Sequence, residues 1–503
     1  MKHEKLADAL NEIDDEYIAQ ALQTKKRHTW RWAGAVAAVL AVAIAGAALL
    51  PKTEPPARLD ADLTSPSSQL TLPQMSTGGE TLTAYYPAQN LFGQVSVPEY
   101  PVLVLYPDSP DGMGYFTDAY DAWQESQERQ YNQPKGYADS LDSYFVQSIP
   151  VLLGGSQEEN HVCSPANIYM ALAMLAETTG GESRQQILSL LGADSIESLR
   201  TQAGYFWNAQ YQNDGANTCL LANSLWLDED YPYSQATADV LAKDYYASVF
   251  HGDLGSQEMN RSLQSWLDEN TGGLLREQAN QVELDQRTAI ALASTLYYRA
   301  KWANSFWADS TAPETFHAPG GDITRDFMHT TLTYGPYYYG EDYSAVHLRL
   351  EGGGYMWLIL PDEGQTPQSI LASSHALTDI LSGRSDNAAH IRVNLSLPKF
   401  DVTGSMELSQ ALQQLGITEV FGENADFSPI LPNCDAYLSQ ADHAARVKID
   451  EEGVEAAAYT VMIAPGAALP PEEEVDFILD RPFLFLITGR GSLPLFAGIV
   501  NNP

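Results

Sequence analysis

Residues 32–50 form an uninterrupted apolar run, WAGAVAAVLAVAIAGAALL, without a single charged side chain. A run of about 18 or more such residues is long enough to cross a membrane as one helix. Cationic residues stay on the cytoplasmic side of a membrane, which places residues 1–31 inside and the rest outside. The basic residues before the run are Lys25, Lys26, Arg27 and Arg31. The sequence therefore predicts a single-pass anchor, with a cleaved signal peptide carrying the motif Ala43-Ile44-Ala45 as the alternative.

The charge of the chain divides at this run. The 503 residues include 27 Lys and Arg against 65 Asp and Glu, which gives a formal net charge of −38. Residues 1–31 hold six basic and six acidic residues, so the whole net charge lies in residues 51–503. A surface this acidic repels phosphate backbones and anionic lipid headgroups. We therefore expect no nucleic-acid partner.

Composition divides the chain further. Residues 51–136 are rich in Pro, Ser, Thr and Gly and predict an extended stalk, although PEYPVLVLYP at 98–107 can pack as a strand on the main domain. Residues 137–503 have the apolar periodicity of one large folded domain. The cysteines are too few and too widely spaced for a disulfide framework, so we expect buried thiols at Cys163, Cys219 and Cys434.

Helical patterns come first in this domain and strand patterns dominate later. Ser164 is a suitable N-cap for a helix with Pro165 at its first position, and Gly180-Gly181 is a suitable stop. Further helices are expected at 141–153, 259–273 and 406–417. Strands are expected at 289–302, 345–350, 355–361, 391–400, 446–450 and 475–480, with two more joined by the turn 489–492. The order has no repeating βαβ rhythm, so it predicts an α+β fold and not a doubly wound sheet.

The sequence contains no local signature of catalysis. It has no GxSxG, HExxH, GxxxxGK[ST] or strand-linked GxGxxG motif, and its ten histidines are scattered. Acidic runs such as PEEEV are better explained as solvated surface than as catalytic pairs. We therefore expect neither an enzyme nor a bound cofactor or metal.

The connection from Glu451 to Pro471, EEGVEAAAYTVMIAPGAALPP, is unusually long for a compact domain. Between Val454 and Ala464 it has one charge, no Pro and no Gly, which is the composition of a strand. Read with period two, one face has no charge and the other carries the single Glu455. The uncharged face consists of Val454, Ala456, Ala458, Thr460, Met462 and Ala464. The segment can therefore enter a sheet without burying a charge, and Gly453 supplies a hinge at its base.

Eight segments in collinear order resemble the serpin family. The likeness covers about residues 137–503, and the segment EEGVEAAA at 451–458 is similar to the proximal hinge EEGTEAAA of that family. The other segments are NHVCSPANIYMALAML, TLYYRAKWANSF, MWLILPDEG, SLPKF, LGITEVFGENADFSPI, DRPFLFLI and PLFAGIVNNP. The resemblance implies a five-stranded central sheet A, two further sheets, about eight to nine helices and an exposed reactive-centre loop. It also implies a monomer.

The resemblance implies a mechanism as well. A target serine protease attacks the loop, forms an acyl-enzyme and is carried along when the loop inserts into sheet A. The implied hinge consists of Glu451, Glu452, Gly453, Val454, Glu455, Ala456, Ala457 and Ala458. The register of the family places the scissile bond between Ala467 and Ala468, with Gly466 and Leu469 as alternatives for the residue before the cut. A small apolar residue there suits an elastase-like or subtilisin-like protease, with a cysteine protease as a further alternative.

Two polar clusters carry over from the family residue by residue. The breach, where insertion begins, is implied to contain Trp302, Lys399 and Glu451. The shutter, a cluster under sheet A that opens to admit the loop, is implied to contain Ser164, Asn167, Ser294 and His443. The sequence departs from the family pattern at four places. Ser294 replaces Asn, Asn167 replaces Ser, Ala444 replaces Lys, and Val454 replaces Thr or Ser.

Two functions from different classes follow from these features. The first is a bacterial, membrane-anchored serpin whose extracellular domain inhibits proteases; if the run at 32–50 is cleaved, it is a secreted one. The second is a non-inhibitory serpin-fold protein that binds a partner at the cell surface. The uncharged inward positions from Val454 to Thr460 favour the inhibitor.

Overall fold

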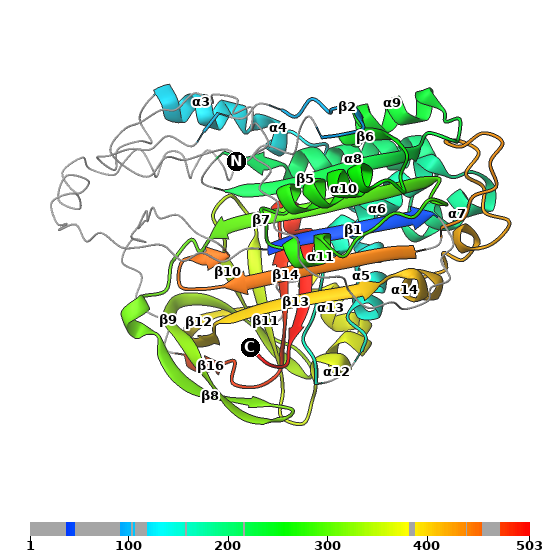
Figure 1. Cartoon of the computed structure of the whole chain (residues 1–503). Coiled ribbons are helices and arrows are strands. Elements are labelled where there is room, and N and C mark those ends of the chain that lie inside the picture. Colours follow the sequence, from blue (N-terminus) through cyan, green and yellow to red (C-terminus); the bar gives the residue numbers. More distant parts are fainter. Residues whose placement is uncertain are drawn as a thin grey trace, which may run out of the picture. The chain divides into compact units, whose positions relative to one another are not determined.

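The computed structural model describes residues 37–45, 91–101, 104–105, 118–155, 158–214, 217–381, 388–438, 440–454 and 473–503. The head predicted at 1–31 and the loop from Glu455 to Glu472 lie outside these ranges. The α+β class is confirmed, with two large sheets and a set of helices (Figure 1).

The first sheet, here sheet A, has its strands in the order β13, β14, β1, β7, β5, β6 and β2 (Figure 1). These strands span Phe400–Glu407, Gln440–Ile449, Ala37–Ala45, Ile290–Lys301, Thr218–Asp228, Ala247–Gly252 and Gln94–Ser96. Two short strands, β4 (Gln212–Asn213) and β15 (Gly453–Val454), pair with β5 and β7 outside this order. The five strands β13, β14, β7, β5 and β6 match the expected five-stranded sheet, and β1 and β2 add to it.

Strand β1 comes from the apolar run at residues 32–50. It is antiparallel to both of its neighbours, with Ala38 opposite Arg446 of β14 and Ala37 opposite Tyr298 of β7. Among the described residues, no helix has the length and apolarity that crossing a membrane requires. The structure therefore gives nine of these residues a strand conformation, in contrast to the predicted transmembrane helix. Their uncharged composition, rich in Ala and Val, is compatible with a strand as well as with a helix. Membrane anchoring stays a prediction.

The second sheet has the order β16, β12, β9, β10, β11, β17, β18 and β3, with β8 paired to β9. The strands span Glu474–Ile478, Ala388–Pro398, Gly321–Tyr339, Tyr343–Arg349, Tyr355–Pro361, Phe483–Thr488, Pro494–Val500, His161–Cys163 and Ala312–Ala318. The 19-residue strand β9 pairs with β12 along most of its length and with β10 at its end. It thereby joins the two further sheets of the expectation into one.

Eight described helices have eight or more residues, namely α3 (Asp118–Ser126), α5 (Leu141–Leu152), α6 (Pro165–Thr178), α7 (Gly181–Leu190), α8 (Ile196–Gln210), α9 (Gln235–Asp244), α10 (Gln257–Asn270) and α13 (Ser374–Leu381). Shorter ones are α4 (Glu128–Tyr131), α11 (Arg276–Ala279), α12 (Pro367–Ala372) and α14 (Ser409–Gln414). The predicted start of α6 is confirmed, because Pro165 is its first residue and the Ser164 hydroxyl accepts a hydrogen bond from the Asn167 amide. Helix α6 packs against β7 and β18 and is almost wholly buried between the two sheets.

Part of the region expected as an extended stalk is folded onto the domain. Strand β2 pairs with β6, and the Trp123 indole of α3 donates a hydrogen bond to Asp214. The ring of Tyr100 lies 5.7 Å from that of Trp207. The strand expected within 98–107 is absent from its described residues, and the pairing falls just before them, at Gln94–Ser96. The aromatic side chains of this region can be buried against the domain, which explains why part of it is folded and not extended.

Two of the three cysteines are buried as expected, and the third is not fully buried. Cys163 and Cys219 are buried and Cys434 is half-buried, and none of the three is in a disulfide. Burial raises the pKa of the Cys163 and Cys219 thiols far above the ordinary value, which makes them unreactive.

Candidate functional site

The three residues of the predicted breach lie together at the end of β14. The Lys399 ammonium is 2.7 Å from the Glu451 carboxylate, and the Thr311 hydroxyl donates a hydrogen bond of 2.8 Å to the same oxygen. The carboxylate is mostly shielded, because only 15% of the Glu451 side chain is exposed. Partial burial opposes ionisation, but these hydrogen bonds outweigh it and lower the pKa of Glu451. Thr311 was missed, since 140 residues separate it from Glu451.

Trp302 holds the backbone that leads into the loop. Its indole donates a 2.8 Å hydrogen bond to the Asp450 carbonyl, and its amide donates one of 3.1 Å to the Glu452 carbonyl. The Phe306 amide donates to the Glu451 carbonyl at 2.9 Å, and the Phe306 ring meets Trp302 edge-on. Three successive carbonyls are therefore fixed by one short segment after β7.

The hinge begins to pair with sheet A at once. In β15, Gly453 lies opposite Lys301 and Val454 opposite Ala300, antiparallel to β7. Val454 is fully buried, as expected of an uncharged residue at the first inserted position. A Cβ atom on Gly453 would lie 2.5 Å from the Ala300 carbonyl oxygen, so only glycine allows this approach. The rest of the predicted hinge, Glu455 to Ala458, and the proposed bond at Ala467-Ala468 lie outside the described residues.

The four predicted shutter residues also meet, underneath β7 and β14. The Ser164 amide donates to His443 Nε2 at 3.0 Å, and the Ser164 hydroxyl donates to the Leu495 carbonyl at 2.5 Å. The Ser294 hydroxyl lies 2.6 Å from Asn167 Oδ1, and the Asn167 amide group donates to the Ser294 carbonyl at 3.1 Å. All four residues are buried. Helix α6, sheet A and β18 are thus connected through one polar cluster.

The two departures from the family at this cluster compensate each other. The resemblance implies Ser on the helix and Asn on the strand, whereas this chain has Asn167 on α6 and Ser294 on β7. Because the two side chains bond directly, exchanging them preserves a helix-to-strand hydrogen bond.

Asn223 of β5 belongs to the shutter but was missed from the sequence. Its Oδ1 lies 2.8 Å from the Ser294 hydroxyl, and its amide group donates to the Tyr245 carbonyl at 2.7 Å. The available signal was the single amide side chain in the wholly buried, mostly apolar strand TCLLANSLWLD. A buried amide needs partners, so its presence in such a strand indicates a polar cluster.

The position between β7 and β14, here the slot, is occupied by β1. Ala41 lies opposite Ser294 on one side and opposite His443 on the other, so the backbone of β1 passes through the centre of the shutter. Both neighbours of the slot are therefore fully paired along this stretch.

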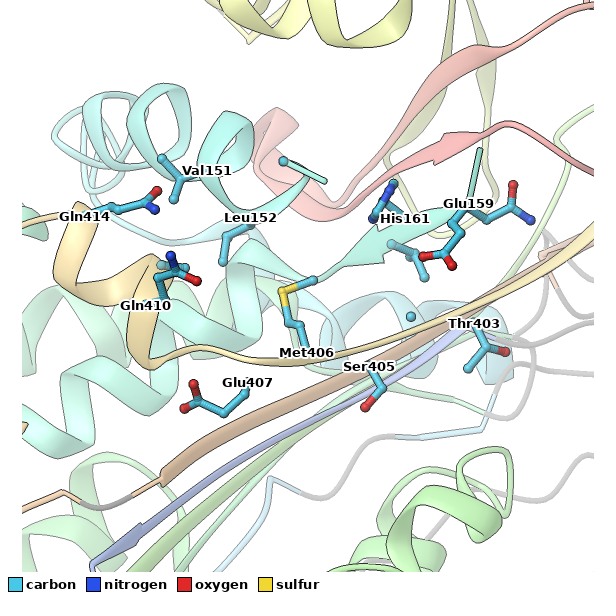
Figure 2. A pocket seen from close by; sticks show the side chains of 15 residues that line it. Val151, Leu152, Glu159, His161, Thr403, Ser405, Met406, Glu407, Gln410 and Gln414 are labelled. Atoms are coloured by element: carbon cyan, nitrogen blue, oxygen red, sulfur yellow. The ribbon is translucent and has the colours of Figure 1, made fainter. Parts of the chain in front are cut away.

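A cavity of about 520 Å³ lies elsewhere in the fold. Figure 2 shows that α5, β3, β13 and α14 supply its walls, with His161, Glu159, Met406 and Gln410 among the labelled side chains. None of the breach, hinge or shutter residues lines this cavity. The cavity therefore does not include these residues, although β13 of sheet A forms one of its walls.

The comparisons with known proteins identify the family of this chain. The neuroserpin of Mus musculus is 28% identical over 387 residues, covering 73% of this chain and 91% of that protein. The leukocyte elastase inhibitor of Sus scrofa is 30% identical over 355 residues, covering 68% of this chain and 93% of that protein. The native-state crystal structure of the thermophilic serpin tengpin matches with a TM-score of 0.63 and 23% identity, covering 74% of this chain and 95% of that one. The family model described as "Serpin (serine protease inhibitor)" matches residues 149–503. The chain therefore belongs to the serpin family.

Proposed function

We propose that this protein is a suicide inhibitor of serine proteases that traps its target by inserting its cleaved reactive loop into sheet A. The observation that carries the proposal is β15. Gly453–Val454 already runs antiparallel to β7, which is the direction that an inserted loop would continue. The buried Val454 and the anchored carbonyls of residues 450–452 support a hinge at this point.

The proposed chemistry belongs to the protease. Its serine hydroxyl attacks the Ala467 carbonyl, the bond to Ala468 breaks, and the amine of Ala468 leaves with the proton that the protease histidine has taken from the serine. The loop is now free at one end and enters the sheet as a strand while its other end stays esterified to the protease. Displacement of the ester from the oxyanion hole prevents hydrolysis. This chain supplies the loop that is cleaved and the sheet that receives it, and it supplies no catalytic residue.

We infer an elastase-like or subtilisin-like target, because the proposed cleavage site is Ala467 and the loop from Val454 to Pro471 has no Lys or Arg. The relative named leukocyte elastase inhibitor supports the same class. The apolar run at 32–50 and the net charge of −38 beyond it support a domain displayed outside a bacterial membrane.

A non-inhibitory binding protein is the second candidate, and one observation favours it. With β1 in the slot, sheet A has no opening next to β7 for the loop to enter. The two candidates differ in what happens after the loop is cut.

The deciding experiment mixes the full-length protein, in detergent, with elastase and separately with subtilisin. An inhibitor forms a complex that survives SDS, and sequencing of the released C-terminal fragment gives the scissile bond. Cleavage without any SDS-resistant complex, by either protease and also in the variant Ala41→Asp that places a charge in β1, would reject the inhibitory function.

The variant Ala456→Arg tests the insertion step itself. Ala456 belongs to the face that must be buried, so a guanidinium there should turn the inhibitor into a substrate that is cut and released. Ala457→Arg is the matched control, because Ala457 belongs to the opposite face with Glu455 and should keep complex formation. Equal loss in both variants would contradict the predicted register.

A further inference from the structure

Strand β1 lies in the path that the reactive loop would take along β7. In β15, Gly453 and Val454 lie opposite Lys301 and Ala300. Continuing this register by two residues would bring Ala456 opposite Tyr298. That position is taken, because Ala37 of β1 lies opposite Tyr298. Both segments run antiparallel to β7, so β1 and the extended loop would have the same direction as well as the same track.

The two segments are also similar in sequence at this register. The positions of β7 from Tyr298 to Ile290 are paired with Ala37–Ala45, AAVLAVAIA, and would be paired with residues 456–464, AAAYTVMIA, after loop insertion. Five of the nine aligned residues are identical, at Ala37, Ala38, Val42, Ile44 and Ala45. Neither segment contains a charge, a Pro or a Gly. Each segment therefore has the uncharged composition, without Pro or Gly, that suits a strand in the middle of a sheet.

We propose that Ala37–Ala45 is an internal plug that competes with the reactive loop for the slot in sheet A. The proposal rests on the proposed function for its consequence, since a filled slot blocks loop insertion beyond Glu455. The pairing of β1 with its two neighbours identifies the strand that fills the slot. This part of the proposal does not depend on any protease.

The slot is lined largely by buried residues. Most residues of β7 and β14 that pair with β1 are buried, and five of them are alanines, Ala291, Ala293, Ala441, Ala444 and Ala445. Two strands that face an empty slot would leave a row of unpaired amides and carbonyls inside the domain. The plug satisfies these groups until the loop replaces it.

The plug is held by the chain itself. Residues 46–90 separate β1 from the next described residue, so the plug is a tethered ligand. Because β1 and its partner strands belong to one chain, their pairing is intramolecular and independent of protein concentration. The residues of β1 also belong to the predicted membrane run, and a segment cannot be a membrane helix and a sheet strand at once. Withdrawal of the plug into a membrane would therefore open the slot.

The first test is disulfide trapping in the full chain. Leu40 lies opposite Ala444 of β14, at a Cα separation that a disulfide can bridge in neighbouring strands. In a Cys434→Ser background, the pair Leu40→Cys and Ala444→Cys should cross-link under mild oxidation. Leu40→Cys with Ala441→Cys is the control, because Ala441 pairs with Ala43, three residues further on. No cross-link in the first pair, or equal cross-linking in both, overturns the plug.

The second test measures access to the slot with a fluorescent peptide of residues 455–464, EAAAYTVMIA. Ala41→Asp places a charge at the centre of β1 and should release the plug, whereas Ala84→Asp, outside the strand, should not. We expect peptide binding to Ala41→Asp at least about tenfold stronger than to the wild type and to Ala84→Asp, because apparent affinity scales with the fraction of open slot. Equal binding to all three proteins overturns the proposal.

These results separate the plug from the inhibitory function, because neither measurement uses a protease. If the Leu40–Ala444 cross-link forms but the Ala41→Asp variant makes no SDS-resistant complex, the plug stands and the inhibitor is rejected. If the wild type makes the complex and no cross-link forms, the inhibitor stands and the plug is rejected.

Discussion

Ser294 is the residue on which the shutter depends most directly, because its hydroxyl lies within hydrogen-bond distance of both Asn167 and Asn223. Ser294→Ala removes the single hydroxyl proton that is available to these two buried amide oxygens. We expect the free energy of unfolding to fall by about 1–3 kcal/mol, the usual cost of an unsatisfied buried polar group. Urea denaturation measures it. Ser143→Ala, which removes an exposed hydroxyl from α5, should change the stability by less than about 0.5 kcal/mol.

Glu451 should make the breach sensitive to acid. Its pKa in the folded protein is lowered, so its pairing with Lys399 contributes stability above the ordinary pKa of a glutamate and loses it as the pH falls through the folded-state pKa. Glu451→Gln should therefore cost about 1 kcal/mol at pH 7 and nothing in strong acid. Unfolding curves of both proteins across this pH range measure the difference. A constant difference at all pH values would contradict this role for the charge.

The sequence could predict the roles of some of these individual residues and not of others. Ser164 and Pro165 were readable because a helix start is a local pattern. The breach and shutter residues came from resemblance to a family and not from local pattern. Thr311 and Asn223 escaped because their partners lie 140 and 71 residues away. Only folding brings such residues together, so Thr311 gave no local signal, and for Asn223 the one signal was an amide within a buried strand.

The short strand β15 lies so close to the backbone of β7 that it requires glycine at Gly453. Gly453→Ala would place a methyl group 2.5 Å from the Ala300 carbonyl oxygen and 2.6 Å from Lys301 Cα, both of them backbone atoms. We expect a loss of about 1–3 kcal/mol from overpacking, measured by urea denaturation. In Gly320→Ala the added methyl group meets no atom within 4 Å, so this control should be nearly neutral. A neutral Gly453→Ala would show that β15 does not need this close approach.

Elements with local start, stop or composition signals were predictable, as α6, α10, β7 and β11 show. Strand β1 was not, because a continuous apolar run does not distinguish a buried strand from a helix. Length favours the helix for residues 32–50, and only the pairing with β7 and β14 in the folded chain identifies the strand. The sequence also did not predict that β9 joins two of the expected sheets, because this depends on how far β9 continues its pairing with β12 and β10.

At the scale of the whole molecule, the plug and the cleaved loop should be interchangeable contributors to stability. Ala41→Asp removes the plug and should lower the unfolding temperature of the intact protein, because the slot then lies unpaired. Cutting the loop with elastase supplies a replacement strand of similar sequence. The unfolding temperature of the cut Ala41→Asp variant should therefore rise and approach that of the cut wild type, whatever strand fills the slot there. Calorimetry of both proteins, intact and cut, measures the four values. If the substitution lowers the unfolding temperature equally before and after cleavage, the plug and the loop do not share a site.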